Sequence, residues 1–94
     1  MNYKDKPLQR PRLARGVRYR WDEIRSQHQL LYPEGLLVLN ETGAAIIELC
    51  DGRSVEKIEQ DLANSYSDTH LKKDLHEFLS GLTQRGLVCN DDNT

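Results

Sequence analysis

The sequence is poor in the residues that build covalent or metal-bound sites. Its 94 residues include two cysteines, Cys50 and Cys89, which lie far apart and form no C-x-x-C pair. We expect both to be reduced thiols packed as small apolar residues. The histidines His28, His70 and His76 have no Cys or second His at ligand spacing, so we expect surface histidines and no metal site.

Long apolar runs are also missing. No segment approaches the roughly 18–20 apolar residues that a membrane span requires. The basic N-terminal segment is not followed by the apolar stretch of a secretory signal. We therefore expect a cytoplasmic protein that does not bind membranes.

Signatures of common catalytic sites are absent as well. The sequence contains no G-x-G-x-x-G, no phosphate-binding loop and no G-x-S-x-G. The acidic residues Glu56, Glu59, Asp61 and Glu77 lie between apolar positions of expected helices, which is typical of a solvated helix face. We expect no enzyme, no catalytic residue and no cofactor.

Short segments with the composition of strands are present. Residues 17–21, VRYRW, alternate apolar and basic side chains, as a half-buried strand does. Residues 28–32 and 36–39 predict two further strands, and the turn at residues 33–35 makes them antiparallel neighbours. A last short strand is expected at residues 87–89.

Three helices are predicted after the strands, at residues 41–50, 55–66 and 69–85. Ser54 is expected to cap the second helix, and Gly86 to end the third. Strands followed by helices indicate an α+β fold, in which a small three-stranded antiparallel sheet packs on three helices.

The chain divides by charge and composition into a single domain with two polar ends. Residues 1–15 contain two prolines and five basic residues, and we expect a flexible basic arm there. Residues 16–90 form the domain, and residues 91–94 form a polar tail.

The stretch EGLLVLNETG does not follow the alternation of a half-buried strand. Leu36, Leu37, Val38 and Leu39 form an unbroken apolar run. Either both faces of this strand are covered, or one edge or face is left for a partner.

The distribution of charge weighs against nucleic-acid binding. Eight of the 13 Lys and Arg but three of the 15 Asp and Glu lie in residues 1–25. Residues 69–85, the expected recognition helix of a winged-helix DNA-binding regulator, carry basic and acidic residues that cancel. We therefore expect no nucleic-acid partner. A winged-helix DNA-binding regulator remains the alternative.

Peptide binding is the second possibility. An unpaired strand edge can accept a guest peptide by β-strand addition. A groove between residues 36–39 and the third helix would offer both sets of apolar side chains to such a guest. The helix residues concerned are Leu71, Leu75, Phe78 and Leu82. Spacing alone leaves open that all of these residues form the core.

Four segments carry a resemblance to a known family. In this order and spacing, "PRLARGVRYRWDE", "LLYPEGLLVLNETG", "IIELCDGRSVEKI" and "FLSGLTQRGLV" resemble the pyrroloquinoline quinone (PQQ) biosynthesis protein D family. The resemblance covers about residues 11–89 and leaves residues 1–10 outside.

This resemblance implies a small winged-helix-like domain that recognises a leader peptide. Members bind the leader of a ribosomally made precursor peptide and present it to a radical S-adenosylmethionine (SAM) enzyme, which cross-links a Glu and a Tyr of the peptide. The peptide adds as a strand beside the third strand and lies against the third helix. The implied peptide-binding residues are Leu36, Leu37, Val38, Leu39, Leu71, Leu75, Phe78 and Leu82. An exposed edge strand also allows a strand-mediated homodimer besides a monomer.

Overall fold

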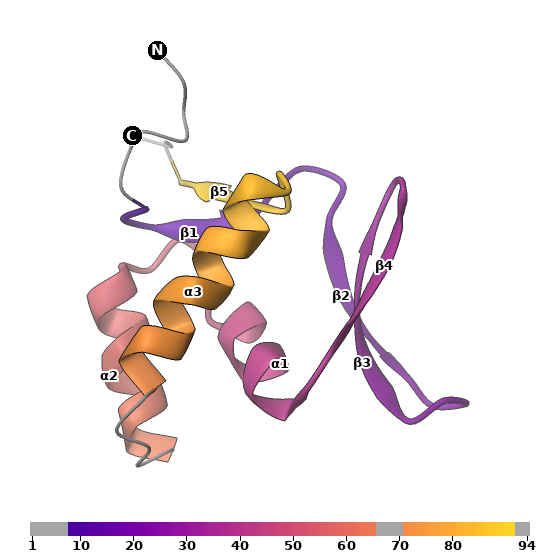
Figure 1. Cartoon of the computed structure of the whole chain (residues 1–94), viewed down its shortest axis with the longest axis horizontal. Coiled ribbons are helices and arrows are strands. Elements are labelled where there is room, and N and C mark those ends of the chain that lie inside the picture. Colours follow the sequence, from indigo (N-terminus) through magenta and orange to yellow (C-terminus); the bar gives the residue numbers. More distant parts are fainter. Residues whose placement is uncertain (1–7, 66–70, 92–94) are drawn as a thin grey trace.

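A computed structural model describes residues 8–65 and 71–91, and in these residues the chain forms five short strands and three helices (Figure 1). In chain order the elements are β1 (Pro11–Leu13), β2 (Arg18–Asp22), β3 (Gln27–Tyr32), β4 (Gly35–Leu39), α1 (Glu41–Glu48), α2 (Val55–Ser65), α3 (Leu71–Gln84) and β5 (Val88–Asn90). The α+β fold and the three predicted helices are confirmed.

The three predicted strands form one antiparallel sheet in the order β2-β3-β4. The alternation in β2 has the expected effect, because Arg18 and Arg20 are exposed while Tyr19 is half-buried. Trp21 lies on the same face as Tyr19 but remains 45% exposed. Helix α1 lies between this sheet and the pair α2 and α3 (Figure 1).

A second, two-stranded sheet was not predicted. Strand β1 pairs antiparallel with β5, so that Arg12 lies opposite Cys89. Residues 11–13 of the segment that we expected to be a flexible arm therefore form a paired strand. Residues 1–7 and 92–94 lie outside the described residues.

Each helix has a local signal at one end. The Asn40 side chain accepts a hydrogen bond from the Gly43 N–H at the start of α1. Ser54 caps α2 as predicted, accepting from the Lys57 N–H at 3.1 Å. Helix α3 ends at a Schellman motif, in which the Leu87 N–H donates to the Leu82 carbonyl and Gly86 has φ +76°.

The core consists of two buried clusters. The first lies among the helices and contains Ile46, Cys50, Val55, Ile58, Leu62, Leu75 and Leu79. The second joins the three-stranded sheet to α1, α3 and β5 and contains Leu30, Leu39, Ile47, Leu82, Leu87 and Val88. Both clusters contact Phe78, which is half-buried.

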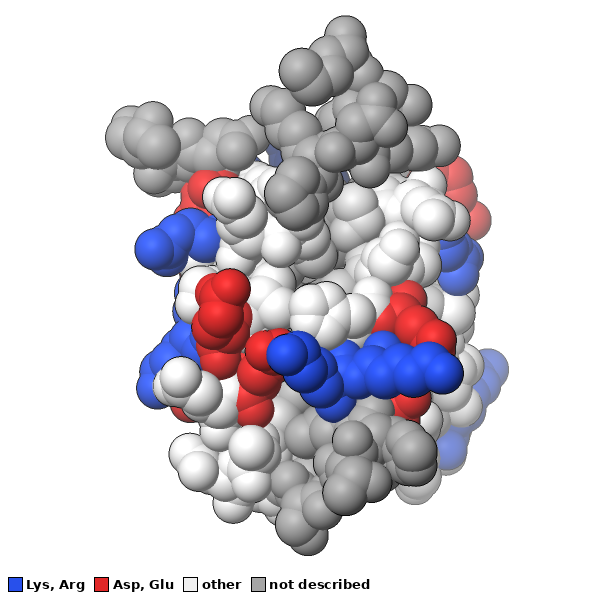
Figure 2. Space-filling model, turned by 60° about the vertical axis from the view of Figure 1, so that its left-hand side comes forward, with Lys and Arg blue, Asp and Glu red and all other residues white. Residues whose placement is uncertain are grey.

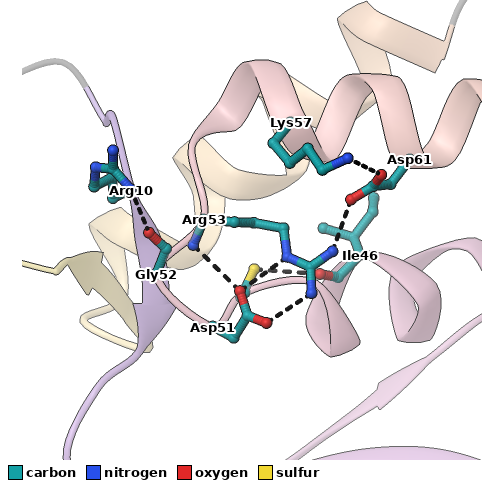
Figure 3. Close-up of polar contacts among 8 residues, drawn as sticks. Arg10, Ile46, Asp51, Gly52, Arg53, Lys57 and Asp61 are labelled. Carbon is teal, nitrogen blue, oxygen red and sulfur yellow. Dashed lines mark hydrogen bonds and ion pairs between the residues drawn. The ribbon is translucent and has the colours of Figure 1, made fainter.

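The loop between α1 and α2 is held by charged side chains (Figure 3). The Arg53 guanidinium donates to both carboxylate oxygens of Asp51 and, at 2.7 Å, to Asp61. Lys57 lies 3.1 Å from the second oxygen of Asp61. The Gly52 N–H donates to the Pro11 carbonyl, so the same loop fastens β1 to the helices.

Because of the ion pairs in this loop, we expect the folded state to lose stability in acid. The hydrogen bonds from Arg53 lower the pKa of Asp51 from 3.8 to about 2. A lowered pKa stabilises the folded state above the unfolded-state pKa, and the contribution is lost as the pH falls from about 4 to about 2. We expect Asp51→Asn to lower the free energy of unfolding slightly at pH 7, because the carboxylate is exposed. Urea denaturation should show wild type and variant converging near pH 2, and a gap that persists there would contradict this assignment.

Candidate functional site

Strand β4 has one edge with no partner strand. It is the last strand in the order β2-β3-β4, and in residues 8–65 and 71–91 it pairs with β3 alone. The main-chain groups along its other edge are thus available to a further strand.

The register shows which residues of β4 direct their main chain to that edge. Tyr32 and Gly35 are paired across a two-residue turn, and such a pair exchanges main-chain hydrogen bonds. Bonded and non-bonded pairs alternate along an antiparallel ladder, so Leu37 is also bonded to β3. The N–H and C=O of Leu36 and Val38 therefore point away from β3.

The side chains of β4 are divided between two environments. Leu39 is 6% exposed and belongs to the second core cluster, against which the half-buried Leu37 also packs. Leu36 and Val38 are 48% and 53% exposed. The apolar run thus contributes to the core at every second position and remains exposed at the others.

Two of the four predicted helix residues lie in the core. Leu75 is 0% exposed and Leu82 is 3% exposed, so neither side chain presents surface to a ligand. The side chain of Leu71 lies outside the described part of the chain. Phe78 keeps partial exposure and lies against α1, where a Cβ on Gly43 would be 3.4 Å from its ring.

Four of the eight predicted residues therefore combine apolar character with accessible surface. We refer to them as the edge site: Leu36, Leu37, Val38 and Phe78. Leu37 and Phe78 pack against the same buried cluster, whereas Leu36 and Val38 lie on the opposite face of the sheet. The main-chain edge of β4 separates the two faces.

Sequence reasoning missed two polar contacts made by side chains of the three-stranded sheet. His28, expected to be a surface residue, is half-buried, and its Nδ1 lies 2.6 Å from the Tyr19 hydroxyl. Arg85 at the end of α3 donates to the Tyr32 hydroxyl at 3.0 Å. Neither contact has a local sequence signal, because each joins elements through the tertiary fold.

The described residues offer no cluster of side chains typical of a metal site. In residues 8–65 and 71–91 no three His, Cys, Asp or Glu side chains gather as metal ligands would. Burial raises the pKa of Cys50 to about 12, so its thiol stays protonated and donates to the Ile46 carbonyl. Within the same part of the chain, no helix is both long and apolar enough to span a bilayer.

Charges on the side of α2 are mixed in sign. Figure 2 shows Lys and Arg beside Asp and Glu there. Arg53 and Lys57 are both engaged by Asp61. A nucleic-acid backbone would find little net attraction on this side.

Comparison with known proteins gives consistent similarities. A family model described as "Coenzyme PQQ synthesis protein D (PqqD)" matches residues 27–88. The chain is 37% identical over 73 residues to a "PqqA binding protein" of Methylococcus capsulatus, covering 77% of this chain and 78% of that protein. A "PqqA binding protein" of Acinetobacter baylyi is 37% identical over 81 residues, covering 84% and 82%.

Two further similarities concern a fused relative. The "Bifunctional coenzyme PQQ synthesis protein C/D" of Methylorubrum extorquens is 41% identical over 81 residues, and the match spans 83% of this chain but 22% of that protein. The solution NMR structure of the PqqD truncation of Methylobacterium extorquens PqqCD superimposes with a TM-score of 0.72 at 38% identity, covering 85% of this chain and 88% of that chain. That truncation is described as a functional, stand-alone recognition element for ribosomally synthesised and post-translationally modified peptides. None of these similarities supports the DNA-binding alternative.

Proposed function

Because the chain belongs to the coenzyme PQQ synthesis protein D family, we propose that it binds the ribosomally made precursor peptide of PQQ biosynthesis. The peptide adds as a strand to the free edge of β4. Its main chain pairs with Leu36 and Val38, whose N–H and C=O groups point to that edge. This unpaired edge, flanked by exposed apolar side chains, is the observation that carries the proposal.

The side chains of the edge site supply the apolar part of the binding free energy. A bound strand places alternate side chains on the two faces of the sheet. One set lies next to Leu37 and Phe78, and the other next to Leu36 and Val38. Removing these apolar surfaces from water helps to offset the entropy that a disordered peptide loses on binding.

The chain itself catalyses no reaction in this proposal. It acts in the cytoplasm as a carrier that presents the peptide to the radical SAM enzyme of the pathway and raises the local peptide concentration there. The enzyme, not this chain, holds the cofactors of the cross-linking reaction. A homodimer that pairs through β4 would occupy the same edge, so that dimer would not bind the peptide there.

Isothermal titration calorimetry with the synthetic precursor peptide tests this function. We expect one peptide per chain and a dissociation constant in the micromolar range or tighter, with a scrambled peptide of the same composition as control. Amide shift changes on titration should cluster at residues 35–39 and around Phe78. Absence of peptide binding together with retardation of duplex DNA would instead favour the DNA-binding alternative.

A further inference from the structure

The three-stranded sheet has two faces, and the helices cover only one of them (Figure 1). One row of the register packs against the second core cluster: Tyr19, Leu30 and Leu37. The neighbouring rows point to the opposite side, because side chains alternate along a strand. One of these rows contains Arg18, Leu31 and Leu36. The other contains Arg20, Gln29 and Val38. We refer to this side as the outer face.

The outer face combines exposed apolar and cationic side chains. Leu36 and Val38 on β4 are about half exposed, and Arg18 and Arg20 on β2 are exposed as well. The Arg20 guanidinium lies 3.8 Å from the carboxylate of Asp22, a long distance for an ion pair. Arg18 makes no ion pair with any described residue. The face is therefore apolar along β4, and along β2 it carries two arginines beside the buried carboxylate of Asp22.

A shallow hollow lies at the end of the sheet where β2 begins and β3 ends, and residues of both faces line it. It is lined by Gly16, Val17, Arg18, Leu31, Tyr32 and Pro33. Arg18 gives the hollow a guanidinium group, and Leu31 gives it an apolar wall. A carboxylate on a short aliphatic stem, the side chain of Glu or Asp, matches both features.

We propose that the outer face docks an acidic protein surface with an apolar centre, belonging to the enzyme that modifies the bound peptide. This inference rests on the proposed function, because it assigns the enzyme the outer face, which adjoins the edge that holds the peptide and shares Leu36 and Val38 with the edge site. The apolar centre of the enzyme surface covers Leu36 and Val38, and its carboxylates meet Arg18 and Arg20. Complementary charges of this kind steer the encounter and fix the orientation of the two proteins.

The geometry also couples the two binding events. A peptide strand beside β4 widens the sheet by one strand, and every second side chain of the peptide joins the outer face. The enzyme then contacts a surface built from both this chain and its guest. Binding of either partner therefore raises the affinity for the other by the same factor.

Variants of the two arginines test the proposal against a matched control. Arg18→Glu reverses the unpaired charge, and Arg20→Gln removes the second charge without placing a new acid beside Asp22. Lys73→Glu, on the exposed side of α3, is the control for a charge reversal elsewhere. For each variant, calorimetry measures the affinity for the precursor peptide, and biolayer interferometry measures the affinity for the radical SAM enzyme with saturating peptide.

We expect Arg18→Glu to weaken enzyme binding by about tenfold and Arg20→Gln by a smaller factor. Lys73→Glu should leave enzyme binding within about twofold, and all three variants should retain peptide affinity. Wild-type enzyme affinity for Arg18→Glu and Arg20→Gln, with normal peptide binding, would overturn this inference alone. If the wild-type protein does not bind the precursor peptide, the proposed function is overturned. Arg18-dependent binding to anionic phospholipid vesicles without any enzyme binding would assign the outer face to a lipid surface and would also overturn the inference.

Discussion

Val38→Pro is expected to weaken binding of the precursor peptide by at least about tenfold while the domain stays folded. The register directs the Val38 N–H to the free edge of β4, so proline removes a donor that serves the guest rather than β3. The pyrrolidine ring also occupies the place where the incoming strand would lie. Calorimetry should show the loss of affinity, and circular dichroism with urea denaturation should show a retained fold.

Leu37→Pro is the matched control for this substitution. Its N–H faces β3 within the ladder, and the side chain packs on the second core cluster. Proline at this position removes a ladder hydrogen bond, so we expect partial or complete unfolding. If Val38→Pro unfolds the domain while Leu37→Pro does not, the assignment of the two edges of β4 is reversed. Normal peptide binding by a folded Val38→Pro protein would remove β4 from the binding site.

Leu75→Ala is expected to lower the free energy of unfolding by about 2–5 kcal/mol, because it creates a cavity in a fully buried cluster. The same substitution should leave the peptide affinity of the folded protein unchanged, since Leu75 has no accessible surface. Urea denaturation measures the first quantity. Calorimetry at a temperature where the variant is fully folded measures the second.

Phe78→Leu provides the contrast on the same helix. Phe78 is half-buried, and leucine preserves much of its contact with the core while removing the exposed part of the ring. We expect a clear loss of peptide affinity with a smaller loss of stability than in Leu75→Ala. Equal affinity losses in the two variants would mean that the peptide reaches the core side of α3, contrary to the burial of Leu75.

The elements that follow from local pattern could be predicted from the sequence. Alternation at residues 17–21 and the turn at residues 33–35 are local signals, and the structure has β2, β3 and β4 there. The strand pair of β1 and β5 could not be predicted in the same way. Its partners lie at opposite ends of the chain, and β1 is a three-residue strand that begins with a proline. Only the complete fold brings these two segments together.

The division of the apolar residues between core and surface was the harder part of the site. Leu36 and Leu37 are identical side chains next to each other, yet one is 48% exposed and the other packs on the core. Which of them faces inward depends on the pairing with β3, a tertiary fact that composition does not contain. The same holds for α3, where an apolar stripe predicts a buried face but not which of its residues lies at the margin.

The shortness of β4 has a consequence for the length of peptide that the domain can grip. Five residues, Gly35–Leu39, extend over roughly 17 Å. A precursor held along that footprint is tethered through a few residues, and the rest of its length stays outside the binding site. A recognition domain with so short a binding strand can therefore keep its peptide bound while most of the peptide stays accessible.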